Sequence, residues 1–225
     1  MRIGAALIAS LLLGACSFVP TGSGSSEPAR STAAARMPVS PDEQKCLADL
    51  GRTGSRFSPL PDRHYGAGCS TLNAVSMSDL RSDLAEIGLS NLGPVTCPTA
   101  NAFAGWARYG VDRAARQILG SRLVRIETMG SYSCRNVAGS SRRSAHATGD
   151  AIDVSGFVLA DGRRIVLTNA WDGGTSAERE FLRVVHRSAC KRFGTVLGPD
   201  YNAAHRDHFH LERSGSGRRG GSFCR

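Results

Sequence analysis

Two short segments of the chain, residues 144–153 and 205–210, hold four of its six histidines. The four are His146 in the first segment and His205, His208 and His210 in the second. Neutral imidazole binds divalent metals and also serves as a general base near neutral pH. The two segments therefore indicate a metal centre, a proton-transfer site, or both.

The second segment has the alternation of a strand. A strand here would place His208 and His210 on one face, and Phe209 and Leu211 on the other. The apolar pair would then pack on the core while the two imidazoles converge in a cleft. A single histidine is more often a hydrogen-bonded structural residue, but two at this spacing beside His205 favour a site.

The first segment adds a carboxylate to the candidate site. Asp153 lies in an apolar run, residues 151–159, and Gly149 allows a tight turn after His146. A lone buried carboxylate is costly, so Asp153 needs a metal or one of the many arginines beside it. A catalytic zinc takes three protein ligands and leaves a fourth position to water. His146, Asp153 and His210 fit that requirement.

The combined pattern resembles a known group of enzymes. Ser144 to Asp153 reads S-x-H-x-x-G-x-A-x-D and is followed by H-x-H, which is similar to zinc peptidases grouped with lysostaphin, the D-Ala-D-Ala metallopeptidases and the sonic hedgehog signalling domain. Residues 44–225 resemble more closely the bacterial extensin-like C-terminal domain family, a branch of that group. The matching stretches are residues 131–135, 144–157, 189–199 and 205–210. The resemblance implies zinc bound by His146, Asp153 and His210.

The resemblance also implies roles for four further residues. His208 would be the general base or would stabilise the tetrahedral intermediate, and His205 would help to polarise the scissile carbonyl. Other branches place a glutamate at the position of Asp207, but strand geometry turns Asp207 to the wrong face unless the backbone bulges, so we favour His208. Arg135 would hold a substrate carboxylate; the alternative is a solvated loop arginine.

The first residues resemble an export signal. Arg2 precedes an apolar run, residues 3–13, which is too short to span a bilayer. Leu13-Gly14-Ala15-Cys16 resembles the lipobox of bacterial lipoproteins, which implies cleavage before Cys16 and its acylation. The alternative is ordinary cleavage with Cys16 as a spare thiol.

These signals predict the domain organisation and location. We expect a signal peptide over residues 1–15, a lipidated Cys16 with a flexible tether over residues 16–41, and one domain over residues 42–225. The protein would lie on the periplasmic face of the cell envelope, anchored to a membrane by lipid. Ser17, rather than Asp, after the cysteine favours the outer membrane.

Six cysteines remain after Cys16. They are Cys46, Cys69, Cys97, Cys134, Cys190 and Cys224. An even number in an exported domain predicts three disulfides, and the sequence does not select among the pairings. Oxidised cysteines would not serve as zinc ligands.

The charge balance favours polyanionic partners. The chain has 28 basic and 19 acidic residues, a net charge of +9, which suits nucleic acid, an anionic membrane or an acidic wall polymer. No nucleic-acid-binding motif or aromatic–basic platform accompanies the charge, and the export signal argues against nucleic acid.

The periodicity predicts an α+β fold with helices first and a hairpin sheet later. The expected helices are residues 76–88, 98–120 and 176–191; the expected strands are residues 123–129, 151–159, 164–168, 195–197 and 207–212. We expect a small antiparallel sheet with helices on one side, stapled by disulfides, and the zinc site on the sheet face.

Two functions fit these features. One is zinc-dependent hydrolysis of peptide bonds in peptidoglycan stem peptides or cross-links. The other is a non-catalytic, metal-binding envelope module that binds wall or a protein partner. The histidine and aspartate set includes a base, which a binding module does not need, and so favours the peptidase.

Overall fold

The structure is a computed structural model that describes residues 40–213 and 223–225. Val39–Arg225 form one compact unit. The expected signal peptide, the acylated Cys16 and the tether up to residue 39 lie outside the described residues. Within the described part of the chain, no helix has the length and apolar character needed to cross a membrane.

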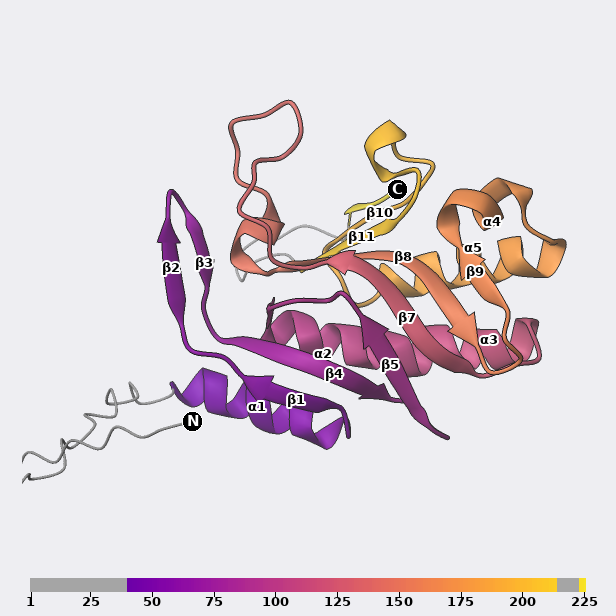
Figure 1. The fold of residues 1–225 in the computed structure, drawn as a ribbon, viewed down its shortest axis with the longest axis horizontal. Helices are drawn as coiled ribbons and strands as arrows, with labels where there is room; N and C mark the ends of the chain where they lie inside the picture. The colour runs from indigo at the N-terminus through magenta and orange to yellow at the C-terminus, as the bar shows by residue number, and fades with distance from the viewer. Residues whose placement is uncertain (1–39, 214–222) are drawn as a thin grey trace, which may run out of the picture. The chain divides into compact units, whose positions relative to one another are not determined.

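The domain combines helices with a large sheet (Figure 1). The helical segments are α1 (Pro41–Arg52), α2 (Cys97–Trp106), the π-helical η1 (Ala107–Asp112), α3 (Arg113–Ile118), the 3-10 turn η2 (Ala145–Thr148), α4 (Leu167–Gly173), α5 (Ser176–Ala189) and the 3-10 turn η3 (Ala203–His205). The strands are β1 (Arg56–Pro59), β2 (Arg63–Gly66), β3 (Cys69–Thr71), β4 (Ala74–Arg81), β5 (Glu86–Ser90), β6 (Val95–Thr96), β7 (Leu123–Gly130), β8 (Ala151–Leu159), β9 (Arg164–Val166), β10 (Thr195–Leu197), β11 (Phe209–Glu212) and β12 (Phe223–Cys224).

The main sheet has ten strands in the order β1-β4-β5-β7-β8-β11-β10-β12, with β6 beside β4 and β9 beside β8. The α+β class is confirmed. The sheet is larger than expected and not purely antiparallel, because β5 pairs with β7 and β10 with β12 in parallel. Six strands also precede α2, four of them in the main sheet and β2 and β3 in a separate two-stranded sheet, so the expected order of helices before strands is wrong.

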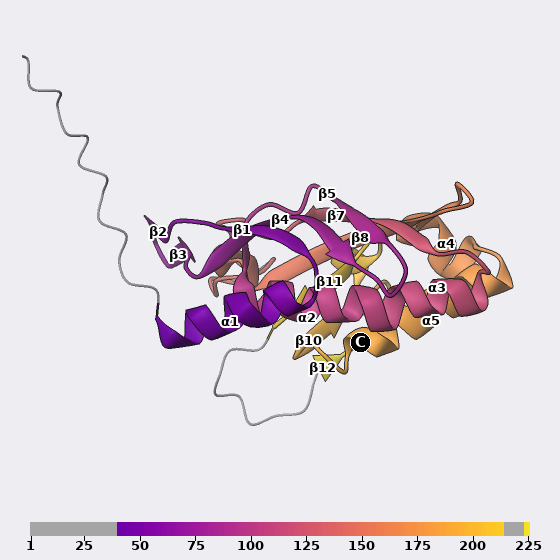
Figure 2. The same ribbon diagram turned by 90° about the horizontal axis from the view of Figure 1, so that it is seen from below.

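Helices α1, α2, α3 and α5 lie along one side of the sheet (Figure 2). Between them and the strands lies an aromatic core in which Phe157 of β8 contacts Trp106 of α2 and Phe181 of α5. The indole Nε1–H of Trp106 donates to the carbonyl of Val185, 3.0 Å away, so its one polar atom is satisfied in the core. Burial of these rings fixes which sheet face the helices cover.

The central strands β8 and β11 turn their polar residues to the opposite face. They pair antiparallel, with His210 directly across from Asp153. Their neighbours Ile152, Phe209 and Leu211 belong to the core. Because strand side chains alternate, Asp153 and His210 point away from the helices. The expected alternation around His210 is therefore confirmed.

The expected helix over residues 76–88 is wrong, because these residues form the hairpin β4–β5. Leu80 and Ile87, seven residues apart, are cross-strand partners and both are fully buried. Leu84 lies in the turn and is 64% exposed. The Ser82 hydroxyl accepts hydrogen bonds from the backbone amides of Leu84 and Ala85, which stabilises the turn. Hairpin pairing thus produces a spacing that imitates a helix.

The other expected elements are close to those observed. The helix over residues 98–120 is confirmed as α2, η1 and α3, and its π-helical segment contains Gly110. A methyl group at Gly110 would lie 2.5 Å from the Ser188 hydroxyl, so glycine permits this contact with α5. The expected strand over residues 164–168 ends at Val166, where α4 begins.

All six domain cysteines are paired, as expected. The disulfides are Cys46–Cys97, Cys69–Cys134 and Cys190–Cys224. The first joins α1 to the start of α2, and the second joins β3 to the loop that precedes η2. Each bridge therefore ties a segment with little core of its own to the rest of the domain.

Removal of the Cys69–Cys134 bridge should destabilise the domain. We expect the double variant Cys69→Ser/Cys134→Ser to lower the free energy of unfolding by about 2–4 kcal/mol, because the bridge closes a long loop of the unfolded chain. Urea unfolding followed by circular dichroism measures this loss, with Cys16→Ser as the control. In the wild type, alkylation under denaturing, non-reducing conditions should label none of the six; labelling of two or more would contradict the pairing.

Candidate metal centre

A short turn positions the first histidine. His146 lies in η2, which begins after Ser144 and ends at Gly149 with φ of 70°, the left-handed conformation that glycine adopts readily. The Ser144 hydroxyl accepts a hydrogen bond from the His146 amide. The His146 ring Nδ1–H donates to the carbonyl oxygen of Ser131, 2.5 Å away. This bond turns the Nε2 lone pair toward the sheet.

Three potential ligand atoms converge on the sheet face opposite the helices. His146 Nε2 lies 3.1 Å from Asp153 Oδ2 and 3.1 Å from His210 Nδ1, and Asp153 Oδ1 lies 3.0 Å from that same nitrogen. A tetrahedral zinc site with bonds of about 2.0 Å separates its ligands by about 3.3 Å. The residues present therefore fit a divalent metal of zinc's size and ligand preference.

Two outer contacts hold the histidines in ligand orientation. The Ser131 carbonyl oxygen holds His146, and Glu212 Oε2 lies 3.3 Å from His210 Nε2. Metal-binding histidines usually donate their second ring N–H to a carbonyl or a carboxylate in this way. Neither partner, Ser131 or Glu212, was predicted from the sequence. The available signal for Glu212 was its position two residues after His210, on the same strand face.

The metal-free site carries strong, opposing electrostatic effects. Burial disfavours the Asp153 carboxylate, yet the adjacent imidazoles of His146 and His210 hold its pKa well below the usual range. Burial alone would lower the pKa of His210, but Asp153 and Glu212 raise that pKa to about 9. Without a metal, His210 therefore carries a proton beside Asp153. A bound cation would replace that proton as the positive partner.

His208 faces the same carboxylate from the segment before β11. Its Nε2 lies 3.6 Å from Asp153 Oδ1, and its Nδ1 lies 2.7 Å from Asp207 Oδ1. β11 begins only at Phe209. Asp207 is therefore outside the strand, and the alternation of strand side chains does not determine where it points. Its carboxylate contacts the ring nitrogen of His208 that is farther from Asp153. A carboxylate in this position fixes which ring nitrogen of the histidine carries the proton.

Arg135 and His205 lie at the edge of this group. Arg135 Nη2 is 3.7 Å from Asp153 Oδ2, and its side chain is 47% exposed. The His205 ring centroid is 5.2 Å from that of His208 and 5.8 Å from that of His210. Burial lowers the pKa of His205 to about 4, with the His208 and His210 rings adding to the shift. His205 is therefore neutral at neutral pH.

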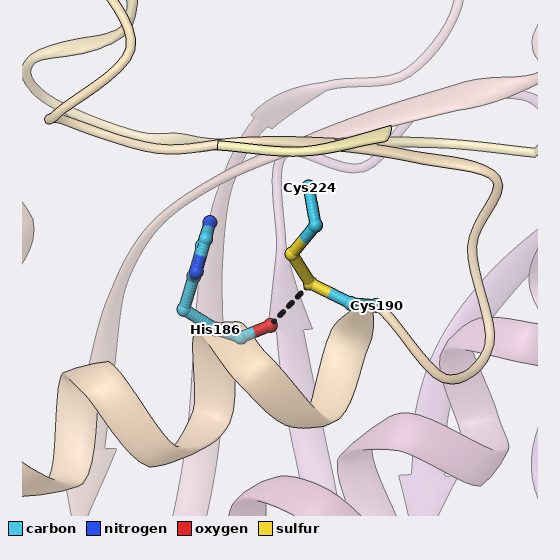
Figure 3. Close-up of side chains that lie close together, drawn as sticks. All are labelled: His186, Cys190 and Cys224. Atoms are coloured by element: carbon cyan, nitrogen blue, oxygen red, sulfur yellow. Dashed lines mark hydrogen bonds between the residues drawn. A yellow bond between two sulfur atoms is a disulfide. The ribbon is translucent and has the colours of Figure 1, made fainter. Parts of the chain in front are cut away.

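A second group of metal-type side chains is chemically different. His186, Cys190 and Cys224 lie together at the end of α5 (Figure 3). The two cysteines form a disulfide, and the Cys190 sulfur lies 3.3 Å from the carbonyl oxygen of His186. A disulfide sulfur is not a thiolate, the form that binds metals. In the oxidised domain, the His146–Asp153–His210 group is therefore the better metal site.

Loss of the Glu212 contact should weaken metal binding while leaving the ligand atoms in place. We expect Glu212→Gln to reduce zinc affinity about 10–100-fold, the usual effect of losing an outer carboxylate partner. Competition with a chromophoric chelator measures the affinity. Glu86→Gln, an exposed strand carboxylate outside the site, is the control. An unchanged affinity in Glu212→Gln would show that this contact does not orient His210.

Fold and site together define a disulfide-linked α+β domain with a candidate two-histidine, one-aspartate metal centre on the sheet face that the helices leave free. Residues 44–225 match the family described as "Extensin-like protein C-terminus". The chain belongs to this extensin-like family, as the sequence motifs indicated. No curated protein and no solved structure matches the chain.

Proposed function

We propose that the protein is a zinc peptidase that hydrolyses peptide bonds in peptidoglycan stem peptides or cross-links. It would then belong to the wider group of zinc peptidases that its motifs resemble. One observation carries the proposal: a complete ligand set, His146, Asp153 and His210, has a further histidine, His208, beside it, and the Asp207 carboxylate contacts that histidine. A purely structural metal site has no use for this additional histidine.

Each side chain has a defined task in this proposal. Zinc held by His146, Asp153 and His210 would make water more acidic and polarise the peptide carbonyl. His208 Nε2 takes the proton of the attacking water and passes it to the leaving amine. The Asp207 carboxylate holds the proton on His208 Nδ1, so that Nε2 is the nitrogen free to accept.

Arg135 and His205 act on the substrate. The half-exposed guanidinium of Arg135 would bind a carboxylate of the stem peptide. Its contact with Asp153 places that carboxylate close to the metal ligands. His205 is neutral, and its Nδ1–H donates to Asn202 Oδ1, 2.7 Å away. This contact holds the imidazole at the edge of the site, where it would help to polarise the carbonyl.

We propose that the protein is exported and anchored by lipid on Cys16, at the periplasmic face of the envelope and more specifically at the outer membrane. The lipobox-like tripeptide before Cys16 supports this location. We expect the mature protein to partition with membranes and Cys16→Ala to release it or leave it unprocessed. Mass spectrometry that shows an unmodified mature N-terminus would contradict the anchor.

The function is tested by release of new amines from purified peptidoglycan. We expect the zinc-loaded wild type to release amines, chelation to stop the release, and added zinc to restore it. The matched control is His146→Ala, which lacks one ligand. A wild type that binds zinc but cleaves no wall peptide from several bacterial species would favour the alternative, a metal-binding envelope module without catalysis.

A further inference from the structure

A groove lies outside the candidate metal centre. It is a groove of about 450 Å³ between α1, the start of α2 and the turn after α5. Its charged lining residues are Lys45, Lys191, Arg192, Arg213, Asp42 and Asp49. The chain has only two lysines, and both line this groove. None of the candidate metal ligands lines it, so the groove needs a separate explanation.

The groove carries an excess of unpaired positive charge. Lys45 Nζ is 3.1 Å from Asp49 Oδ2, so these two charges offset each other. Lys191, Arg192 and Arg213 form no ion pair with any residue that the structure describes. Asp42, in the first turn of α1, is the one other carboxylate of the lining. Three cations against one carboxylate create a site for an anion.

The walls of the groove are fixed before any ligand arrives. Cys46 lines the groove, and its disulfide to Cys97 joins α1 to the start of α2. Arg192 packs directly on Gly105 of α2: a methyl group there would lie 2.8 Å from its Nη1. The same guanidinium lies 5.4 Å from the centre of the Tyr109 ring. Such preorganisation reduces the entropy lost on binding.

Gly105 is informative because glycine in a helix costs about 1 kcal/mol relative to alanine. It lies inside α2, where no turn or left-handed backbone requires it. What it provides is space for the Arg192 guanidinium. The helix thus gives up some intrinsic stability at the point where it holds a guanidinium whose residue, Arg192, lines the groove.

We propose that this groove binds a phosphate-bearing anion through Lys191, Arg192 and Arg213. The planar guanidinium donates paired hydrogen bonds to phosphate oxygens, and lysine adds a mobile point charge. The first turn of α2 contains no acidic residue, so its partial positive charge adds to the attraction. Two negative charges on a phosphate monoester match the local excess better than a single carboxylate does. The groove's volume suits a ligand the size of a lipid headgroup.

Two sources can supply this chemistry: a soluble phosphate ester or the headgroup of an anionic lipid. Position favours the lipid source, because α1 begins at Pro41, soon after Cys16, the proposed lipid anchor. Both arms of the test use the full chain with Cys16→Ser, so that no acyl chain contributes. One arm titrates inorganic phosphate and follows backbone amide resonances; the other measures sedimentation with vesicles of phosphatidylglycerol and phosphatidylcholine against phosphatidylcholine alone, at constant ionic strength.

We expect Lys191→Gln/Arg192→Gln to weaken binding at least about tenfold, the effect of losing charged hydrogen bonds. The control, Arg63→Gln/Arg122→Gln, removes the same charge from exposed positions outside the groove and should change binding less than about twofold. If the groove variant weakens binding of phosphate alone, the ligand is a soluble phosphate ester. If it weakens binding of vesicles alone, the ligand is a lipid headgroup. Equal losses in the two double variants, or no binding in either arm, would overturn the proposal.

A third variant tests the built site without changing the net charge. Gly105→Ala should displace Arg192 and weaken binding several-fold while the free energy of unfolding stays equal or rises, since alanine favours the helix. Affinity equal to that of the wild type would show that the position of Arg192 does not select the ligand, and the proposal would fail.

Discussion

His208→Ala should slow peptide hydrolysis by about 10²–10⁴-fold while zinc remains bound, because a positioned acid–base group contributes that factor. The His208 ring is not one of the three converging ligands, and its Nε2 lies 3.6 Å from Asp153 Oδ1. The measurement pairs zinc content with the rate of amine release from peptidoglycan. The loss should fall on kcat, since His208 acts on the proton rather than on substrate binding.

Asp207→Asn is the matched variant for this prediction. The amide keeps the shape of Asp207 but weakens its hold on His208 Nδ1, which lies 2.7 Å away. We expect a smaller loss of rate, about 10–100-fold, with zinc retained. If Asp207→Ala were the slow, zinc-replete variant and His208→Ala kept its rate, Asp207 would be the base and the assignment to His208 would be wrong.

His146→Ala and His210→Ala should each lose both the metal and the activity. Two remaining protein ligands hold zinc poorly, and a closed set of three is what fixes its geometry. We expect bound zinc to fall from about one ion per chain to below about one tenth after dialysis. His64→Ala, on the exposed strand β2, is the control and should keep its zinc.

The loss of zinc and activity counts as evidence for the ligand set only if each variant is still folded. The circular dichroism of each ligand variant should match that of the wild type, because His146 and His210 lie outside the hydrophobic core. A well-folded His210→Ala that retains full zinc would contradict the ligand set. A well-folded variant without zinc but with full activity would contradict the peptidase mechanism.

The candidate site could be predicted because its residues carry a local signature. The alternation of Phe209, His210 and Leu211 encodes which side chains face the core, and the structure confirms that Phe209 and Leu211 belong to the core while His210 does not. His208 precedes the strand, but its ring also faces Asp153. A carboxylate inside an apolar strand was a second signal, since an unpartnered buried charge is costly. What the residues alone could not supply was the pairing of β8 with β11, which brings Asp153 and His210 together.

The remaining errors come from information that is not local. Leu80 and Ile87 satisfy a helical spacing and a hairpin equally well, and the Ser82 turn decides between them. Parallel pairing of β5 with β7 depends on the crossover through α2 and α3, which no single window contains. The disulfide partners are set by the same long-range packing, so the cysteine count predicted their number and not their pairing.

X-ray absorption at the zinc edge of the purified wild-type protein tests the central claim most directly. Among residues 40–213 and 223–225, which the structure describes, two groups could hold a metal, and one of these two contains sulfur. The account predicts one zinc per chain with nitrogen and oxygen neighbours at about 2.0–2.1 Å and no sulfur. A sulfur shell at about 2.3 Å would place the metal at Cys190 and Cys224 instead, and a zinc-free protein after refolding with zinc would contradict the metal centre altogether.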